Sequence, residues 1–158
     1  MGMSSGRLAG IARHDRPRGP IETVSEVAVN TREGVHGDYR GAMKPDRPRR
    51  RQISLMTAEG WAAAMADLDI DPGAIEWWNR RVNLLVEGIA LPRREGARIH
   101  IGETLVIEVA QECDPCSRME EIHPGLKAAL TPDWRGGVLG RVLADGMIRV
   151  GDDVRIEE

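Results

Sequence analysis

A series of short segments rich in Val, Ile and Leu, each closed by a turn with Gly or Asp, most constrains the fold of this chain. Segments of four to eight such residues are typical of β-strands. Residues 99–101 and 104–111 form an expected strand pair joined by Gly102-Glu103. Residues 138–144 and 147–150 flank Asp145-Gly146, which predicts a tight hairpin because both residues tolerate positive φ. The other expected strands are residues 7–13, 21–30, 52–56, 81–87 and 154–156.

Helical signals are fewer. Thr57 can cap a helix whose apolar positions Trp61, Met65 and Leu68 follow the spacing of one buried face. Asp71-Pro72 resembles a second helix start, and residues 123–130 can form a short third helix. Many short strands with few helices predict a mainly β fold, a β-barrel or closed sandwich with a few short helices. An open parallel sheet is disfavoured because crossover helices are available only once or twice.

Length and charge limit the possible classes of protein. The chain has 158 residues, which suits one domain over residues 1–158, and its formal net charge of -3 argues against a nucleic-acid partner. No apolar run reaches the roughly 18 residues of a membrane helix, and the start of the chain lacks the apolar core of a signal peptide. We therefore expect a cytoplasmic protein with no membrane partner.

The basic residues are almost all arginine, because only Lys44 and Lys127 of the 22 basic residues are lysines. Genomic codon bias explains this composition most simply. The alternative is functional, since the planar guanidinium binds phosphate and other oxyanions well. The basic, proline-containing segment from Lys44 to Arg51 is expected to be a solvated loop, with an anion-facing loop as the alternative.

Cys113 and Cys116 stand in a loop directly after the expected strand 104–111. A zinc site needs two further ligands, and the four histidines are scattered without ligand spacing. A thioredoxin-like redox pair needs a strand, the two cysteines and a helix in that order, and no such helix is evident. The remaining interpretation is one reactive thiolate near an arginine such as Arg118.

Two other segments allow both a structural and a functional interpretation. Residues 34–40 form a glycine-punctuated loop in which Asp38 can accept from backbone amides, and the functional alternative places Arg40 against a ligand. Residues 80–84 are either a strand edge with solvated charges or an anion contact with Asn83 buried and hydrogen-bonded. Spacing alone favours the turn for the first segment and leaves the second open.

Taken in order, seven segments resemble the MOSC domain, the C-terminal domain of eukaryotic molybdenum cofactor sulfurases. The resemblance covers about residues 20–156 and implies a β-barrel-rich fold. The segments are Gly-Val-His-Gly-Asp (34–38), Arg-Gln-Ile-Ser-Leu (51–55), Arg-Val-Asn-Leu-Leu-Val-Glu-Gly-Ile (81–89), Gly-Glu-Thr-Leu (102–105), Pro-Cys-Ser-Arg-Met (115–119), Arg-Gly-Gly-Val (135–138) and Ile-Arg-Val-Gly-Asp (148–152).

The resemblance implies a site around Cys116, whose thiolate would either carry sulfur or ligate molybdenum as the catalytic and metal-binding group. Because molybdopterin ends in a phosphate, arginines in the pocket have a physical reason to be there. Cys113 would resolve a persulfide on Cys116 or have no role. The positions expected around the cofactor are Arg118, Arg51, Asn83, His36 and Asp38, with Gly37 and Gly137 as shared glycines.

Three functions remain open under this resemblance. The first is a stand-alone MOSC protein that binds molybdenum cofactor or acts as a sulfurase-like transferase with a sulfur donor. The second is a molybdenum-dependent reductase of N-hydroxylated compounds that works with a flavoprotein partner. The third is a non-catalytic sulfur carrier. Pyridoxal phosphate is not expected, because the Schiff base needs a suitably placed lysine and only Lys44 and Lys127 are present.

Overall fold

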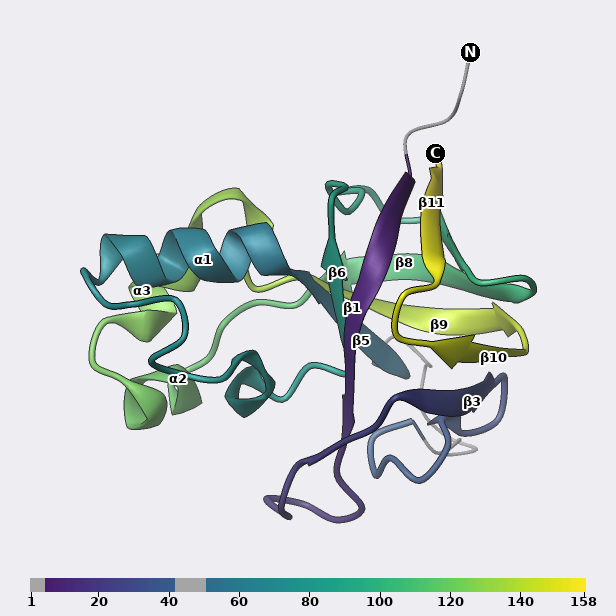
Figure 1. Cartoon of the computed structure of the whole chain (residues 1–158), viewed down its shortest axis with the longest axis horizontal. Helices are drawn as coiled ribbons and strands as arrows, with labels where there is room; N and C mark the ends of the chain where they lie inside the picture. The colour runs from purple at the N-terminus through teal and green to yellow at the C-terminus, as the bar shows by residue number, and fades with distance from the viewer. Residues whose placement is uncertain (1–4, 42–50) are drawn as a thin grey trace.

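The computed structural model describes residues 5–41 and 51–158, which form a closed β-barrel with a group of helices on one side (Figure 1). The seven barrel strands, in the order in which they lie side by side, are β11 (Asp153–Glu157), β7 (Arg98–Ile101), β8 (Leu105–Glu112), β9 (Val138–Ala144), β5 (Ile53–Thr57), β6 (Leu84–Glu87) and β1 (Ser5–Arg13). The barrel closes where β1 pairs antiparallel with β11, with Gly6 opposite Val154. The expected mainly β fold is confirmed. Of the basic segment, only Arg51 lies within the described residues.

Four further strands, one of them β10 (Gly146–Arg149), complete the sheets. β2 (Glu22–Thr23) extends the barrel sheet beside β1, while β3 (Glu26–Asn30) pairs with both β10 and β4 (Gly34–Val35). The expected strand over residues 21–30 is therefore divided in two. Its two parts belong to different sheets.

The hairpin expected at Asp145-Gly146 is wrong. β10 pairs with β3 and not with β9, and neither Asp145 nor Gly146 has a positive φ. Side chains and backbone at the bend explain the difference. The Asp145 carboxylate accepts from the Thr31 backbone N–H at 2.9 Å, and the Thr104 hydroxyl donates to the Asp145 carbonyl at 2.8 Å. These contacts direct the chain from one sheet to the other. In contrast, β7 and β8 form the expected antiparallel pair.

The helices depart from expectation except at Thr57. Helix α1 (Ala58–Asp67) begins there, but Asp71-Pro72 forms a turn in which the Asp71 carboxylate accepts from the Gly73 N–H at 2.9 Å. Only the later part of residues 123–130 is helical. The remaining helices are η1 (Trp77–Arg80), α2 (Arg118–Ile122), α3 (Leu126–Leu130) and η2 (Pro132–Trp134). Of these, α2 and the two 3-10 helices η1 and η2 were not expected. No helix in the described ranges is long and apolar enough to cross a bilayer.

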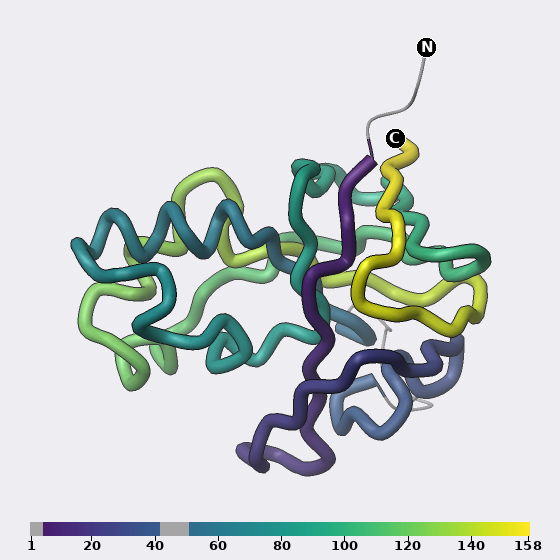
Figure 2. The backbone as a smooth tube through the Cα atoms, in the orientation of Figure 1, coloured from purple at the N-terminus to yellow at the C-terminus, as the bar shows by residue number. Residues whose placement is uncertain are grey.

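Apolar side chains form two separate cores. The larger fills the barrel with Val, Ile and Leu side chains, and the smaller lies between the barrel and the helices. Trp61 and Met65 of α1 are buried in the smaller core and Leu68 is partly buried there, as the spacing predicts. Figure 2 shows the consequence, a helical lobe beside the barrel with the start of β1 next to the end of β11.

Removing the cap of α1 is expected to destabilise the protein modestly. The Thr57 hydroxyl accepts from the Gly60 N–H at 2.9 Å, and Thr57 has extended dihedrals. Thr57→Ala should lower the free energy of unfolding by about 1 kcal/mol, measured by urea denaturation, while Thr57→Ser should lose much less because it keeps the hydroxyl. Equal losses in the two variants would contradict a capping role.

Candidate functional site

A cleft of about 540 Å³ is lined both by barrel residues and by residues of the helical lobe. Its walls come from the loops after β1 and β4, from β5, and from η1 and the residues that follow it. The segment between β8 and α2, α2 itself and β9 complete them. These segments are distant in the chain. The barrel brings them together because β1, β5 and β6 are adjacent strands.

Both cysteines line this cleft from the loop between β8 and α2. Cys116 is exposed, whereas Cys113 is half-buried. The loop is fixed at both ends, because the Cys113 N–H donates to the Gly137 carbonyl at 2.8 Å and the Met119 N–H donates to the Cys116 carbonyl at 3.0 Å. The structure thus presents one accessible thiol and one sheltered thiol in the same cleft.

Carboxyl groups flank the sheltered thiol. Burial raises the pKa of Glu112, and a hydrogen bond and the charge of Asp114 raise it further, while Arg93 opposes this shift. Asp114 lines the cleft between the two cysteines in sequence. The Glu112 carboxyl therefore binds a proton more readily than a free glutamate does.

The cleft carries six guanidinium groups and three carboxyl groups, the latter on Asp38, Asp114 and Glu121. Within residues 5–41 and 51–158, none of these arginines forms an ion pair with a carboxylate within 4.0 Å. Unpaired guanidinium groups in a concave site favour an anionic ligand. The six residues are Arg18, Arg40, Arg51, Arg80, Arg81 and Arg118.

Arg81 shows the effect of crowding these charges. Its φ is +68°, a left-handed conformation, and its buried Nη1 has no hydrogen-bond partner among the described residues. Burial lowers the pKa of Arg81, and the like charges of Arg118, Arg40 and Arg18 lower it further. A bound anion would satisfy Nη1 and reduce this repulsion.

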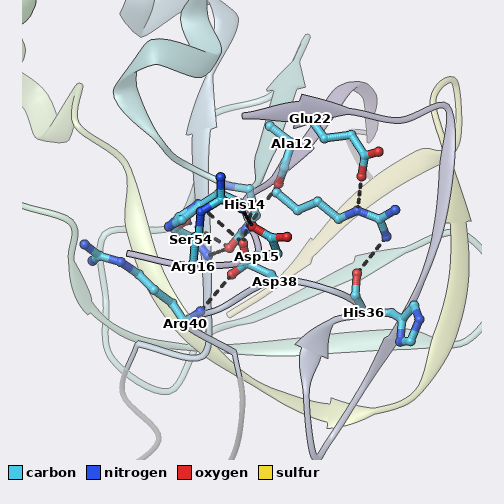
Figure 3. A network of polar contacts seen from close by, with 11 residues as sticks. Ala12, His14, Asp15, Arg16, Glu22, His36, Asp38, Arg40 and Ser54 are labelled. Carbon is cyan, nitrogen blue, oxygen red and sulfur yellow. Dashed lines mark hydrogen bonds and ion pairs between the residues drawn. The ribbon is translucent and has the colours of Figure 1, made fainter. Parts of the chain in front are cut away.

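Asp38 and His14 form a buried pair in the cleft wall. The Asp38 carboxylate accepts from the backbone N–H of His14 at 3.1 Å and of Arg40 at 3.3 Å, and His14 Nδ1 lies 3.6 Å from Asp38 Oδ1. Figure 3 shows the His14 ring beside Asp38 and Ser54, with the Arg40 side chain extending to one side. Asp38 thus positions the loop that carries Arg40.

Asn83 connects three strands through both ends of its amide. Its Oδ1 accepts from the Ser54 N–H and hydroxyl, both at 3.1 Å, and its Nδ2 donates to the Ala12 carbonyl at 3.2 Å. The Asn83 N–H also donates to the Ser54 hydroxyl at 3.0 Å. Asn83 is therefore buried and hydrogen-bonded, as one interpretation of residues 80–84 expected, while the anion contact of that interpretation stays a prediction. These contacts hold the cleft wall together.

Five of the six expected site residues line the cleft, and His36 does not. Cys116, Arg118, Arg51, Asn83 and Asp38 are brought together there. The side chain of His36 is 62% exposed and its Nδ1 lies 3.2 Å from Glu33 Oε2. Figure 3 shows its ring directed away from the His14–Asp38 pair.

Sequence reasoning missed His14 and Arg18, and it mentioned Arg40, Arg80 and Arg81 only as one of two alternatives. No motif marks His14, which directly follows β1, or Arg18, which lies in the Pro/Gly loop after it. The adjacent pair Arg80-Arg81 was a signal in the sequence for this cleft. Arginine is rarely buried, so two arginines beside an expected buried strand indicate a function for their side chains.

The residues considered for other cofactors lie elsewhere. Lys127 is an exposed residue of α3 outside the cleft, and Lys44 lies outside the described residues. In the described part of the chain, no three His, Cys, Asp or Glu side chains form a group that could hold a metal ion. A ligand set with a single protein thiolate needs no such group.

We expect His14 to make the protein less stable in mild acid. Burial is the main cause that lowers the pKa of His14 below 6.5; Asp38 opposes the shift, while Arg81 and Arg40 add to it. The unfolded chain therefore binds this proton first as the pH falls below about 6.5, and the folded state loses stability until its own lower pKa is passed. Thermal midpoints between pH 7.5 and 5.5, about one unit either side of the free histidine value, should fall more steeply for the wild type than for His14→Gln. Parallel curves would contradict this assignment, because the other groups contribute equally to both proteins.

Known proteins share this sequence pattern and fold. The MOSC domain family matches residues 32–155. The YuaD protein from Bacillus subtilis is similar in structure, with a TM-score of 0.79 at 17% identity over 98% of this chain and 97% of that chain. YiiM from Escherichia coli has a TM-score of 0.68 at 15% identity over 96% and 70% of the two chains. YiiM from Geobacillus stearothermophilus has a TM-score of 0.63 at 18% identity over 97% and 73%. No curated protein matches the chain.

The match covers most of the chain, and the barrel agrees with it. The fold and the site define the class of protein: a mainly β barrel with an arginine-rich cleft that carries a cysteine. The chain belongs to the MOSC family. The identities to the solved structures are low, so those structures support the fold alone.

Proposed function

We propose that the cleft binds the molybdenum cofactor and that Cys116 supplies the thiolate ligand of molybdenum. The observation that carries this proposal is the exposed Cys116 thiol in a cleft with six guanidinium groups and no ion pair to any described carboxylate. MOSC domains are associated with this cofactor. A thiolate is a soft ligand suited to such a metal, whereas a hydroxyl is not.

The arginines of the cleft also fit the anionic end of the cofactor, its phosphate. Arg81 offers a buried Nη1 that lacks a partner among the described residues, and Arg118 and Arg40 are close enough to lower its pKa. Guanidinium groups bind phosphate through pairs of parallel hydrogen bonds. Arg81, with Arg118 and Arg40, would hold the phosphate, and Arg51 would add charge at the same wall.

The remaining wall residues would orient the ligand. When bound, the cofactor supplies a redox-active metal. Asp38 fixes the backbone of Arg40, and Asn83 ties the wall strands together. Burial lowers the pKa of His14, so the neutral form of its ring is favoured in the cleft wall, where it can hydrogen-bond a ligand.

Metal and pterin analysis of freshly purified protein tests the proposal. The protein would be produced in cells that make the cofactor, and molybdenum would be quantified together with the fluorescence of the oxidised pterin. Molybdenum and pterin in equal amounts support cofactor binding. Persulfide on Cys116 without molybdenum would instead select the sulfur carrier.

A second assay separates a binding protein from an enzyme. If molybdenum and pterin are present, reduction of benzamidoxime with a flavoprotein reductase would identify a molybdenum-dependent reductase of N-hydroxylated compounds. The absence of turnover by loaded protein would leave cofactor binding or sulfur transfer as the activity. The cofactor-free protein is the matched control.

A further inference from the structure

Arg80 is a buried guanidinium whose contacts among the described residues include a thiol but no carboxylate. Its residue is 7% exposed, and its Nη2 donates to the carbonyls of Cys113 at 2.9 Å and Gly136 at 3.1 Å. The same Nη2 lies 3.3 Å from Cys113 Sγ, and the buried Nε has no partner among the described residues. A buried cation without a counter-charge is costly. Among these contacts, Cys113 Sγ is the atom that can become negatively charged.

The two thiols have complementary exposure in one short loop. Cys116 is exposed and Cys113 is half-buried beside Arg80, and both line the cleft. The loop follows β8 and is followed by α2, so the local order is strand, cysteine pair and short helix. This order was not expected from the sequence, because α2 was not predicted. Two cysteines separated by two residues in such a loop are typical of thiol–disulfide exchange sites.

We propose that Cys113 and Cys116 form a reversible dithiol–disulfide couple that reacts with small anionic disulfides. Cys116 is the attacking thiol because it is accessible. Cys113 is the resolving thiol, because it is sheltered and its sulfur accepts the Arg80 hydrogen bond. A role of this couple in controlling cofactor loading rests on the proposed function. The exchange reaction itself does not.

The reaction balances in two steps without any further oxidant. The Cys116 thiolate attacks a disulfide RSSR, so a Cys116–SR bond forms, the S–S bond of RSSR breaks and RS⁻ leaves. The Cys113 thiolate then attacks Cys116 Sγ, so the intramolecular disulfide forms and the second RS⁻ leaves. The two protein thiols are oxidised by two electrons, RSSR is reduced to two thiols, and the two thiol protons pass to the departing thiolates.

The charge of the cleft determines the class of disulfide. Arg81 and Arg118 face the same cleft as Cys116, without carboxylate partners among the described residues. A disulfide with carboxylate groups is therefore attracted, and one with ammonium groups is repelled. Once the internal disulfide has formed, Cys116 has no thiolate to offer a metal, so the dithiol form alone would accept the cofactor.

Intact-mass analysis of metal-free protein tests the couple directly. Glutathione disulfide should leave the wild type two hydrogens lighter, with no lasting adduct and two glutathiones released. Cys113→Ser should stop at one glutathione adduct on Cys116, and Cys116→Ser should react at least about tenfold more slowly, since its remaining thiol is sheltered. Stable adducts on both cysteines of the wild type, or equal rates for the two variants, would overturn the proposal.

Two further comparisons test the roles of the arginines. Resolution of the mixed disulfide should slow at least about tenfold in Arg80→Gln, less in Arg80→Lys, and not in the exposed control Arg98→Gln. At low salt, glutathione disulfide should react roughly tenfold faster than cystamine, and the ratio should approach one at about 0.5 M salt. If Arg80→Gln does not fold, Arg80→Lys and the disulfide comparison still decide. Unchanged resolution in Arg80→Lys together with no preference between the disulfides would refute these roles.

The outcome is independent of molybdenum binding. A protein that contains molybdenum but does not form the internal disulfide would refute the couple and leave the proposed function intact. A protein that forms the disulfide but never contains molybdenum would do the reverse. If both hold, the pre-oxidised protein should acquire no molybdenum until a dithiol reductant is added.

Discussion

Cys116→Ser is expected to lose the bound molybdenum and pterin almost completely, while Cys113→Ser is expected to retain most of both. A neutral hydroxyl is a poor substitute for a soft thiolate ligand. The loss in affinity should exceed the 10–100-fold that removal of an outer-shell partner typically costs. Molybdenum content and thermal midpoint, measured side by side for the two variants, check this prediction. The stability of both should stay near that of the wild type, because Cys116 is exposed and Cys113 is half-buried.

A structural zinc site predicts a different pattern in the same experiment. Each ligand of such a site is needed, so both variants would lose metal and stability to a similar extent. Large, equal losses together with zinc in the wild type would contradict the single-cysteine site. Retention of molybdenum in Cys116→Ser would contradict the assignment of the ligand.

Gly137→Ala should destabilise the protein by at least about 3 kcal/mol, the range of severe backbone and packing changes. Gly137 has φ +101°, and a Cβ added there would lie 1.9 Å from the Leu55 carbonyl oxygen. That oxygen belongs to the backbone of β5, directly opposite the start of β9, so it cannot move without breaking the barrel. Because the Gly137 carbonyl also accepts from the Cys113 N–H, the cleft should be disturbed as well.

Gly96→Ala is the matched control for this prediction. Gly96 also has a positive φ, +91°, but an added Cβ there has nothing within 4 Å. Its cost should be near the roughly 1–2 kcal/mol that an L-residue incurs in a left-handed conformation. Urea denaturation of both variants isolates the steric contribution. Equal losses would show that dihedral strain alone, and not the contact with Leu55, explains the need for glycine.

Local signals were sufficient for most barrel strands and for the start of α1. Short segments rich in Val, Ile and Leu, each closed by Gly or Asp, predicted these strands, since such composition is a property of each segment by itself. Thr57 predicted the start of α1, because its hydroxyl acts on an amide three residues away. The Pro-Cys-Ser-Arg segment, through its resemblance to MOSC domains, led to Cys116.

Local signals failed where the partner of a segment lies far along the chain. Asp145-Gly146 has the composition of a hairpin, but contacts with Thr31 and Thr104 direct β10 to β3. The strand expected from residue 81 starts at Leu84, because Arg81 takes a left-handed conformation after η1. Helices α2 and α3 have five residues each, too few for a periodic pattern. They are stabilised by packing, α3 on α1 and α2 on α3.

The contrast between Asp38 and His36 shows how sequence and tertiary structure divided the site. The sequence by itself determined that residues 34–38 form a turn with an aspartate suited to backbone amides, and that a cysteine follows β8. Only the tertiary structure decided which side chains meet. Val35 points into the core, so its neighbour His36 points to solvent, whereas Asp38 is buried beside His14, the residue after β1. The barrel brings strands that are distant in sequence into one wall. The arginines gather there because long-range strand pairing sets their positions, and no local pattern encodes that pairing.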